Sequence, residues 1–331
     1  MSGRGGAVSG RGGAAAAQPA VRLTRDTVSY TYDATLPSRA AVGPDSVVVF
    51  ETHDARAGAL LDRTPGSLFD LPRATPGRGN PLTGPLFVEN AQPGDSLVVT
   101  IDQIRLDPAG WCGGHAHTGP LEPGRIPRPR GRICTVRASE VRFSDSIVLP
   151  SAPMIGCIGT APGGPEAPLA GLPGRYGGNL DHPVISPGAR VHLPVFVPGG
   201  QLYIGDVHAC QGDGELSGVA VEIGAEVTVT VAVRSGAGLR WPWAEKDGRI
   251  MVMTTAMEFA DARRMAVEEM LLALERQLGM EPAEGLALIS VAGDLRVGQA
   301  FGGMELTLRL EMPASLGLRP EGGPVSGGSA E

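Results

Sequence analysis

The sequence GQLYIGDVHACQGDGELSG, residues 200–218, places a loop dense in polar side chains between two apolar runs. The runs at residues 202–204 and 219–223 are typical of strands, and a loop fixed between two strands is a common place for functional side chains. Asp206 and His208 are two residues apart, so on an extended segment both point to the same face. The alternative is a tight hairpin whose acidic side chains only cap turns. The polar side chains that favour a functional site are those of Asp206, His208, Gln211, Asp213 and Glu215.

Strand patterns recur along the chain on both sides of this loop. A turn containing Gly precedes a Val-rich run at residues 42–51, 92–101, 186–195 and 223–233. In the last run Val227 and Val229 alternate with threonines, which is the period of a half-buried strand. The turn-and-strand units are too unevenly spaced for an internal repeat. We therefore expect a β-sandwich or barrel-like catalytic region over residues 21–250.

The periodicity changes after residue 250 and predicts a helix over residues 255–279. Its apolar stripe steps by three and four residues through Phe259, Ala262, Ala266, Met270, Leu274 and Leu278. Thr255 and Glu258 match a capping box, and Gly279 suits the C-terminal cap. A second helix is expected after Pro282, followed by strands. The fold class is thus a β-rich α+β protein with a smaller α+β region at residues 251–317, between a disordered tail at 1–20 and a flexible tail at 318–331.

Charge and cysteine content exclude several classes of protein. The net charge of −7 argues against nucleic acid or an anionic membrane as partner. The four cysteines have no CxxC spacing, which disfavours a zinc ribbon and a disulfide framework, and Cys210 is interpreted as a small packed thiol. Because no segment has the length of a membrane span or the apolar core of a signal peptide, we expect a cytoplasmic protein.

Residues 107–135 form the longest stretch without a strand or helix pattern, as expected of a lid or a surface loop. Within it His115 and His117 are two residues apart, which suits two metal ligands on one extended face. A solvated loop is the alternative for this segment and for its arginines.

Four ordered motifs resemble the acetamidase/formamidase family of amide hydrolases. They lie at residues 80–101 (NPLTGPLFVENAQPGDSLVVTI), 153–162 (PMIGCIGTAP), 174–215 (GRYGGNLD and GDVHACQGDGE) and 288–299 (LISVAGDLRVGQ). The resemblance implies hydrolysis of the C–N bond of a small aliphatic amide, such as formamide or acetamide, to a carboxylate and ammonia. It also implies a homo-oligomer, which we expect to be a dimer.

Amide hydrolysis needs either a nucleophilic Ser or Cys with a base, or a metal ion with a carboxylate base. No GxSxG elbow is present, so the metal route is favoured. The candidate ligands are Asp54, Asp181 and His208, and zinc is the expected ion with calcium as the alternative. For Asp54 and Asp181 the competing interpretation is a carboxylate that only forms a turn.

Glu215 and Asp213 are the candidate catalytic residues. Glu215 is the expected general base, unless it is a solvent-facing glutamate at a strand edge. Asp213 or Asp206 would accept a hydrogen bond from the ring of His208 and orient it. The expected substrate-binding groups are Asn179 with the backbone amides of Gly178 and Gly212 at the oxyanion, and Gln211 at the amide nitrogen.

Two other classes of protein remain open at this stage. One is a non-catalytic β-rich protein of the same fold that binds an amide or a lactam. The other is a structural β-protein whose Asp and Glu turns resemble calcium loops. Metal content and ammonia release separate these classes from the enzyme.

Overall fold

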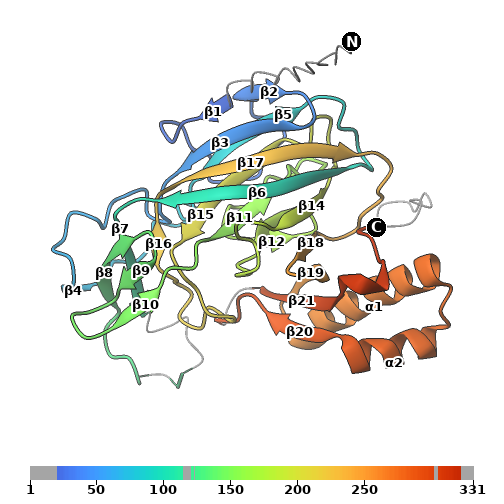
Figure 1. Ribbon diagram of the computed structural model, residues 1–331. Coiled ribbons are helices and arrows are strands. Elements are labelled where there is room, and N and C mark those ends of the chain that lie inside the picture. Colours follow the sequence, from blue (N-terminus) through green and yellow to red (C-terminus); the bar gives the residue numbers. More distant parts are fainter. Residues whose placement is uncertain (1–20, 115–120, 123, 302–304, 322–331) are drawn as a thin grey trace, which may run out of the picture.

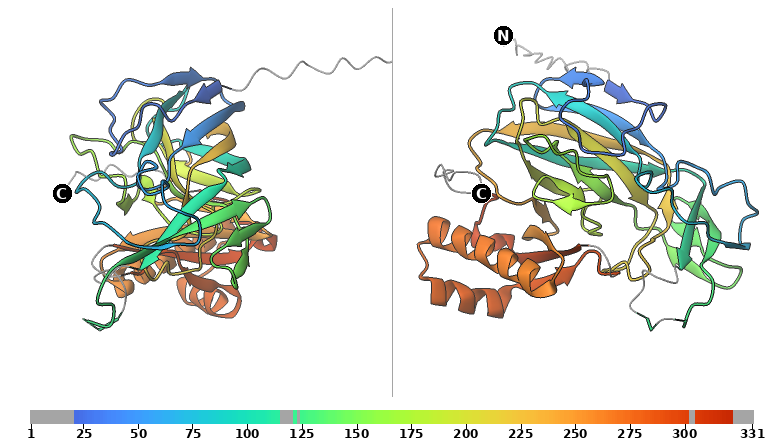
Figure 2. Two further views of the ribbon diagram at one scale, coloured as in Figure 1. Left: turned by 90° about the vertical axis from the view of Figure 1, so that its left-hand side faces the viewer. Right: turned by 180° about the vertical axis from the view of Figure 1, so that it is seen from behind.

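The computed structural model describes residues 21–114, 121–122, 124–301 and 305–321. Two large sheets face each other across one apolar core (Figures 1 and 2). Two helices pack on the part of the first sheet that the C-terminal strands form. The shared core takes Val48 and Phe50 from one sheet and Ile155, Ile158 and Ile204 from the other, all fully buried. The expected β-rich sandwich is confirmed.

Among the described residues the first sheet has nine strands. In spatial order they are β1 (Val21–Leu23), β3 (Ser46–Thr52), β17 (Ala225–Arg234), β6 (Ser96–Leu106), β14 (Arg190–Pro194), β18 (Trp243–Lys246), β19 (Arg249–Ala256), β21 (Leu306–Pro313) and β20 (Asp294–Val297). Val227, Val229 and Val231 of β17 are fully buried while the threonines between them are half-buried, as the alternation predicts. The boundary expected at residue 250 falls inside β19, so this sheet runs on without a break into the C-terminal region.

The second sheet has twelve strands in the described part of the chain. Its main path is β10 (Val148–Pro150), β9 (Glu140–Arg142), β8 (Arg130–Arg137), β7 (Ala109–Gly114), β16 (Glu222–Ile223), β15 (Leu202–His208), β11 (Met154–Gly159), β13 (Gly177–Asn179) and β12 (Pro173–Gly174). Beside this path β2 (Ala40–Val42) pairs with β5 (Leu82–Val88), β5 also pairs with β15, and β4 (Leu68–Asp70) pairs with β8.

Strands β7 and β8 correct the expectation that residues 107–135 lack strands. Their glycines hide the strand pattern, yet close packing requires them. A Cβ on Gly131 would lie 2.5 Å from the Phe69 ring, and one on Gly110 would lie 2.6 Å from the carbonyl oxygen of Glu222. His115 and His117 lie outside the described residues.

The C-terminal region contains α1 (Phe259–Leu278), α2 (Pro282–Ala292) and a short 3-10 turn at Ala314–Leu316. The middle of the predicted stripe is buried from Ala262 to Leu274. Ala266, Met270 and Leu274 belong to a second apolar cluster, which also holds Leu318 at the start of the expected flexible tail. Gly279 takes φ 67° and its N–H reaches the last turn, so the C-terminal cap is confirmed. The capping box is wrong, because Thr255 belongs to β19 and the helix begins after Glu258 without a side-chain cap.

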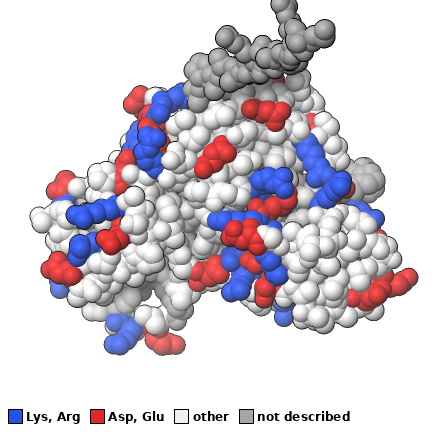
Figure 3. Space-filling model, in the orientation of Figure 1, with Lys and Arg blue, Asp and Glu red and all other residues white. Residues whose placement is uncertain are grey.

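The described helices include none that is both long and apolar enough to cross a membrane. On the face drawn in Figure 3, acidic and basic side chains are interspersed and neither sign prevails.

Candidate active site

Two neighbouring buried strands, β15 and β11, position the polar cluster. Asp206 and His208 lie on β15, whose seven residues are all buried. The register of the two strands places Gly156 of β11 opposite Asp206. A Cβ on Gly156 would lie 2.5 Å from Asp181 Oδ1 and 2.9 Å from Asp206 Oδ2. Only glycine therefore lets these two carboxylates converge.

Five side chains meet at this place, namely Asp181, Asp206, His208, Glu215 and Glu222. One atom each of Asp181, Asp206 and His208 lies within 4.8 Å of the other two, and the same holds for His208, Glu215 and Glu222. His208 Nε2 is 3.3 Å from Glu222 Oε2 and 3.6 Å from Asp206 Oδ1. None of the five is more than 8% exposed. The expectation that Asp206 and His208 share a face agrees with this arrangement.

The outer oxygen atoms of the two aspartates are held by amides. Asn80 Nδ2 donates to Asp206 Oδ2 (2.7 Å) and to Asn179 Oδ1 (2.9 Å). Asn179 Nδ2 in turn donates to Asp181 Oδ2 (2.5 Å) and to Gln299 Oε1 (3.1 Å). Each aspartate is thus fixed by one oxygen and presents the other toward the cluster.

Four atoms of the cluster are buried without a hydrogen-bond partner in the described part of the chain. They are Asp181 Oδ1, Asp206 Oδ1, His208 Nε2 and Glu222 Oε2. Buried polar atoms are normally paired, and an unpaired one is destabilising by about 1–3 kcal/mol. Four electron-pair donors facing one another are the donor set of a cation, so these residues fit a divalent metal ion.

Gln211 fixes the tautomer of His208. Its Nε2 donates to the carbonyl oxygen of Asp181 (2.6 Å), so its Oε1 accepts from His208 Nδ1 (2.7 Å). With the proton on Nδ1, the Nε2 lone pair faces Asp206 and Glu222. A ligating histidine is commonly oriented through its other ring nitrogen in this way.

The backbone of the site is strained at four non-glycine residues. Asn80, Asp181, Asp206 and Glu215 have φ of 52°, 49°, 55° and 39°. Each left-handed residue of this kind is destabilising by about 1–3 kcal/mol and persists only where its surroundings fix it. Such residues are common at functional sites. Here Asp181, Asp206 and Glu215 belong to the cluster, and Asn80 donates a hydrogen bond to Asp206.

Burial and mutual repulsion favour the protonated carboxyls when no cation is present. Burial, with repulsion from Asp206, raises the pKa of Asp181 to about 8 and that of Glu222 to about 7. Burial and the charge of Asp181 likewise raise the pKa of Glu215. Burial opposes the protonation of His208, but Glu222 and Asp206 outweigh it and raise its pKa. Without a cation, the cluster therefore holds protons up to a higher pH than free carboxyls do.

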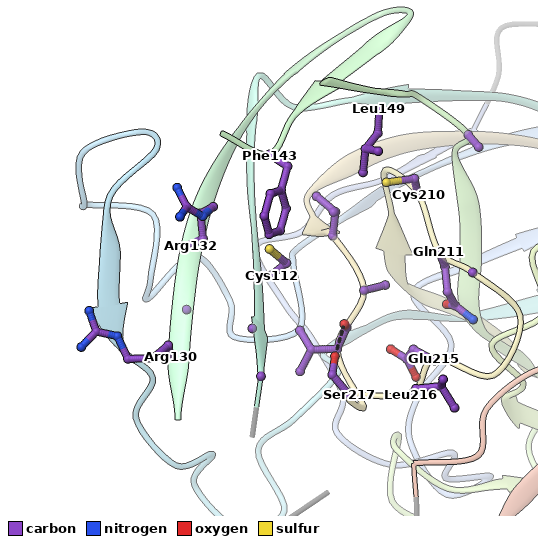
Figure 4. Close-up of a pocket in the computed structure, with 18 of the residues that line it drawn as sticks. Cys112, Arg130, Arg132, Phe143, Leu149, Cys210, Gln211, Glu215, Leu216 and Ser217 are labelled. Atoms are coloured by element: carbon purple, nitrogen blue, oxygen red, sulfur yellow. Dashed lines mark hydrogen bonds between the residues drawn. The ribbon is translucent and has the colours of Figure 1, made fainter. Parts of the chain in front are cut away.

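A cavity of about 590 Å³ opens onto the cluster and is lined by Asp181, Asp206, Glu215 and Glu222. A second cavity, of about 830 Å³, lies beside it, and Glu215 and Val219 line both. In Figure 4 Glu215 stands beside Leu216 in the second cavity, away from Arg130 and Arg132. Glu215 is thus the carboxyl of the cluster with the widest access to bound molecules.

The structure places two expected site residues outside the cluster. Asp54 Oδ1 accepts from Trp111 Nε1 (3.0 Å) and from the Arg56 amide (2.8 Å), and its Oδ2 accepts from the Gly58 amide (2.8 Å). Asp213 instead forms a two-point ion pair with Arg309 of β21 (2.7 and 3.0 Å). Both carboxylates are engaged in holding loops.

The expected substrate-binding residues surround the cluster. Asn179 lines the site cavity, but its side chain is engaged with Asn80, Asp181 and Gln299. Gly178 is buried in β13, opposite Ile158 of β11. Gln211 and Gly212 line the second cavity.

Sequence reasoning missed Glu222 and Asn80. Glu222 follows Val221 in an apolar run and lies directly opposite His208 in the pairing of β16 with β15. A glutamate within such a run is a signal for a buried polar role. Asn80 lies just before β5, at the start of a motif quoted above, and only the folded sheet brings it to Asp206.

Comparison with known proteins agrees with this geometry. The crystal structure of the acetamidase from Bacillus halodurans matches with a TM-score of 0.82 at 32% sequence identity, covering 89% of this chain and 98% of that one. The chain belongs to the acetamidase/formamidase family. The model of this family of amidohydrolases matches residues 166–247, which include all five residues of the cluster and its loop.

Two further relatives match over shorter stretches. A protein of Schizosaccharomyces pombe is 49% identical over 61 residues, which are 18% of this chain and 15% of that protein. The formamidase of Methylophilus methylotrophus is 47% identical over 45 residues, 14% of this chain and 11% of its own. The chain therefore aligns with only a small part of these two relatives, whereas it aligns with nearly all of the Bacillus acetamidase.

Proposed function

We propose that this protein hydrolyses the C–N bond of a small linear amide to a carboxylate and ammonia, at a site that binds a divalent metal ion. The observation that carries the proposal is the set of four buried, unpaired donor atoms beside a cavity in a member of an amidohydrolase family.

The ligands in this proposal are Asp181, Asp206 and His208, with Glu222 as the fourth donor. A nitrogen donor among the oxygens favours zinc over calcium, which prefers oxygen ligands alone. When bound, such an ion supplies a Lewis acid that polarises the amide carbonyl and makes water more acidic.

Glu215 is the proposed general base. It faces the cavity, so it can reach a water molecule beside a bound amide, and burial with the charge of Asp181 raises its pKa, which makes the carboxylate more basic. It takes a proton from the attacking water and returns it to the departing nitrogen, so that ammonia leaves.

The amide side chains near the cluster act as positioning groups in this proposal. Gln211 keeps the proton of His208 on Nδ1, and Asn179 fixes Asp181. The oxyanion role expected for Asn179, Gly178 and Gly212 stays a prediction, as does the homodimer.

The test measures metal content and ammonia release on the purified protein. Formamide, acetamide and propionamide are offered to protein stripped with a chelator and reloaded with Zn²⁺ or Ca²⁺. Glu215→Gln should bind metal like the wild type but lose at least about a hundredfold in kcat, the scale of general base catalysis. Glu284→Gln, on the exposed surface of α2, is the matched control.

Normal turnover by Glu215→Gln would remove Glu215 from this role. Bound metal without ammonia release from any amide would favour the non-catalytic binding protein.

A further inference from the structure

The site cavity is larger than a small amide needs. Its volume of about 590 Å³ corresponds to the liquid volume of about twenty waters, at ~30 Å³ each. Formamide has three heavy atoms and acetamide four, so either would leave most of this space empty. The other residues that line the cavity therefore indicate which kind of longer substrate it could bind.

Two arginines, Arg56 and Arg73, line this space together with the carboxylate cluster. Arg56 is half-buried. Its Nη2 donates a hydrogen bond to the Pro72 carbonyl oxygen (3.3 Å), and its guanidinium carbon lies 5.8 Å from the centre of the Trp111 ring. Arg73 is exposed. Within the described ranges, neither arginine has a carboxylate within ion-pair distance. Both keep free donors for an anion.

The position of Arg56 is fixed through Asp54. One oxygen of Asp54 holds both the Arg56 amide and the Trp111 indole, and the other holds the amide of Gly58. Burial lowers the pKa of Arg56, against the attraction of Glu222 and Asp54, yet a guanidinium stays charged at neutral pH. The backbone of Arg56 is thus fixed before any ligand binds, which lowers the entropy lost when its side chain binds one.

We propose that the preferred substrate is a linear amide that carries a carboxylate at the end remote from the scissile bond, and that Arg56 binds this carboxylate with Arg73 beside it. This inference rests on the proposed amide hydrolysis and specifies its substrate class. The planar fork of a guanidinium matches a carboxylate with two parallel hydrogen bonds. Leu71 and Trp111 line the same cavity and offer an apolar wall to the connecting methylenes.

The experiment compares succinamic acid with its neutral methyl ester and with butyramide, on zinc-loaded full-length protein. The wild type should show a kcat/KM for the acid at least about tenfold above both neutral amides, because hydrogen bonds to charged groups contribute about 1.5–3 kcal/mol. Arg56→Gln should lower kcat/KM for the acid by about ten- to a hundredfold and leave the neutral amides within about twofold. Arg73→Gln should have a smaller effect that fades at high salt, because Arg73 is exposed.

Arg296→Gln, at an exposed site on β20, is the matched control. Arg56→Lys keeps the charge without the fork and should recover part of the preference if Arg56→Gln folds poorly. Isothermal titration with succinate gives a second measurement, in which Arg56→Gln should weaken binding.

Equal kcat/KM for acid and neutral amides in the wild type would overturn the inference. So would an equal loss for all amides in Arg56→Gln, because Arg56 would then only balance the charge of the cluster. No turnover of any amide would refute the proposed function instead, and the succinate titration would then decide on Arg56: weaker binding in Arg56→Gln supports its anion site, and unchanged binding overturns it.

Discussion

Replacing Asp206 by asparagine should stabilise the metal-free protein while it weakens metal binding. In the wild type one oxygen of Asp206 lies within 4.8 Å of one oxygen of Asp181, and neither inner oxygen has a hydrogen-bond partner in the described structure. Asparagine removes a negative charge from this place. Its carbonyl oxygen can still accept from Asn80, and its NH₂ group would then point toward His208 Nε2, which is 3.6 Å from the replaced atom.

The size of the effect follows from the separation of the charges. Two unit charges 4.8 Å apart repel by about 3 kcal/mol at an effective dielectric constant of ~20. Because Asp181, with a pKa of about 8, is only about half ionised at pH 8, Asp206→Asn should raise the free energy of unfolding of the chelated protein by about half of this, ~1.5 kcal/mol, at that pH. The gain should shrink toward pH 5, since the raised pKa values leave Asp181 and Glu222 protonated and uncharged there.

Urea denaturation at pH 8 and pH 5, in chelator and in excess Zn²⁺, measures both halves of this prediction. Zinc should stabilise the variant less than the wild type, by about 2.7 kcal/mol less for each hundredfold loss of affinity. Asp102→Asn removes the same charge from an exposed strand position and should change neither measurement by more than about 0.5 kcal/mol.

A variant that is less stable than the wild type in chelator at pH 8 would refute the reasoning, because the inner oxygen of Asp206 would then have a stabilising partner. Undiminished zinc binding by the variant would show that Asp206 is not a ligand.

Three other predictions concern the cluster and the helical region. The chelated protein should lose stability as the pH rises from 4 to 8, by up to about 1.4 kcal/mol per pH unit for each carboxyl. The reason is that the raised pKa values of Asp181 and Glu222 favour folding only while these groups are protonated. Thermal melts at several pH values measure this loss, and they should show none in excess Zn²⁺. Gly156→Ala should lower zinc affinity at least about tenfold by calorimetry, because its Cβ would lie 2.5 Å from Asp181 Oδ1, and unchanged affinity would disprove the need for glycine. Leu274→Ala should be destabilising by about 2–5 kcal/mol in urea denaturation, with full activity per folded molecule. Leu278→Ala, at a position that is 42% exposed, should have little effect. Equal losses of stability in the two variants would contradict the packing of α1.

The fold could be predicted well where one local pattern determines one element. The alternating valines of β17 and the stripe of α1 each report burial directly, and Gly279 marks the end of the helix. The prediction failed for β7 and β8, whose glycines are required by close contact with residues distant in sequence, such as Phe69. Local propensity carries no information about such a neighbour.

Prediction of the site residues succeeded and failed for similar reasons. Asp206 and His208 could be placed together because they are two residues apart on one strand, and they stay together although Asp206 takes φ 55°. Asp54 is the opposite case: an aspartate at a strand end has the sequence signature of a ligand, but Trp111 of β7 is what its carboxylate holds. Glu222 reaches His208 only through the pairing of β16 with β15, which no sequence spacing encodes.

The bracing of the site by late parts of the chain has a consequence for biosynthesis. Gln299 secures Asn179, and Arg309 secures the loop that bears Asp213. On the ribosome the earlier strands emerge first and can pair while these two residues are still being translated. If the cluster binds a metal ion as proposed, the nascent protein should therefore not capture it until translation has passed Arg309.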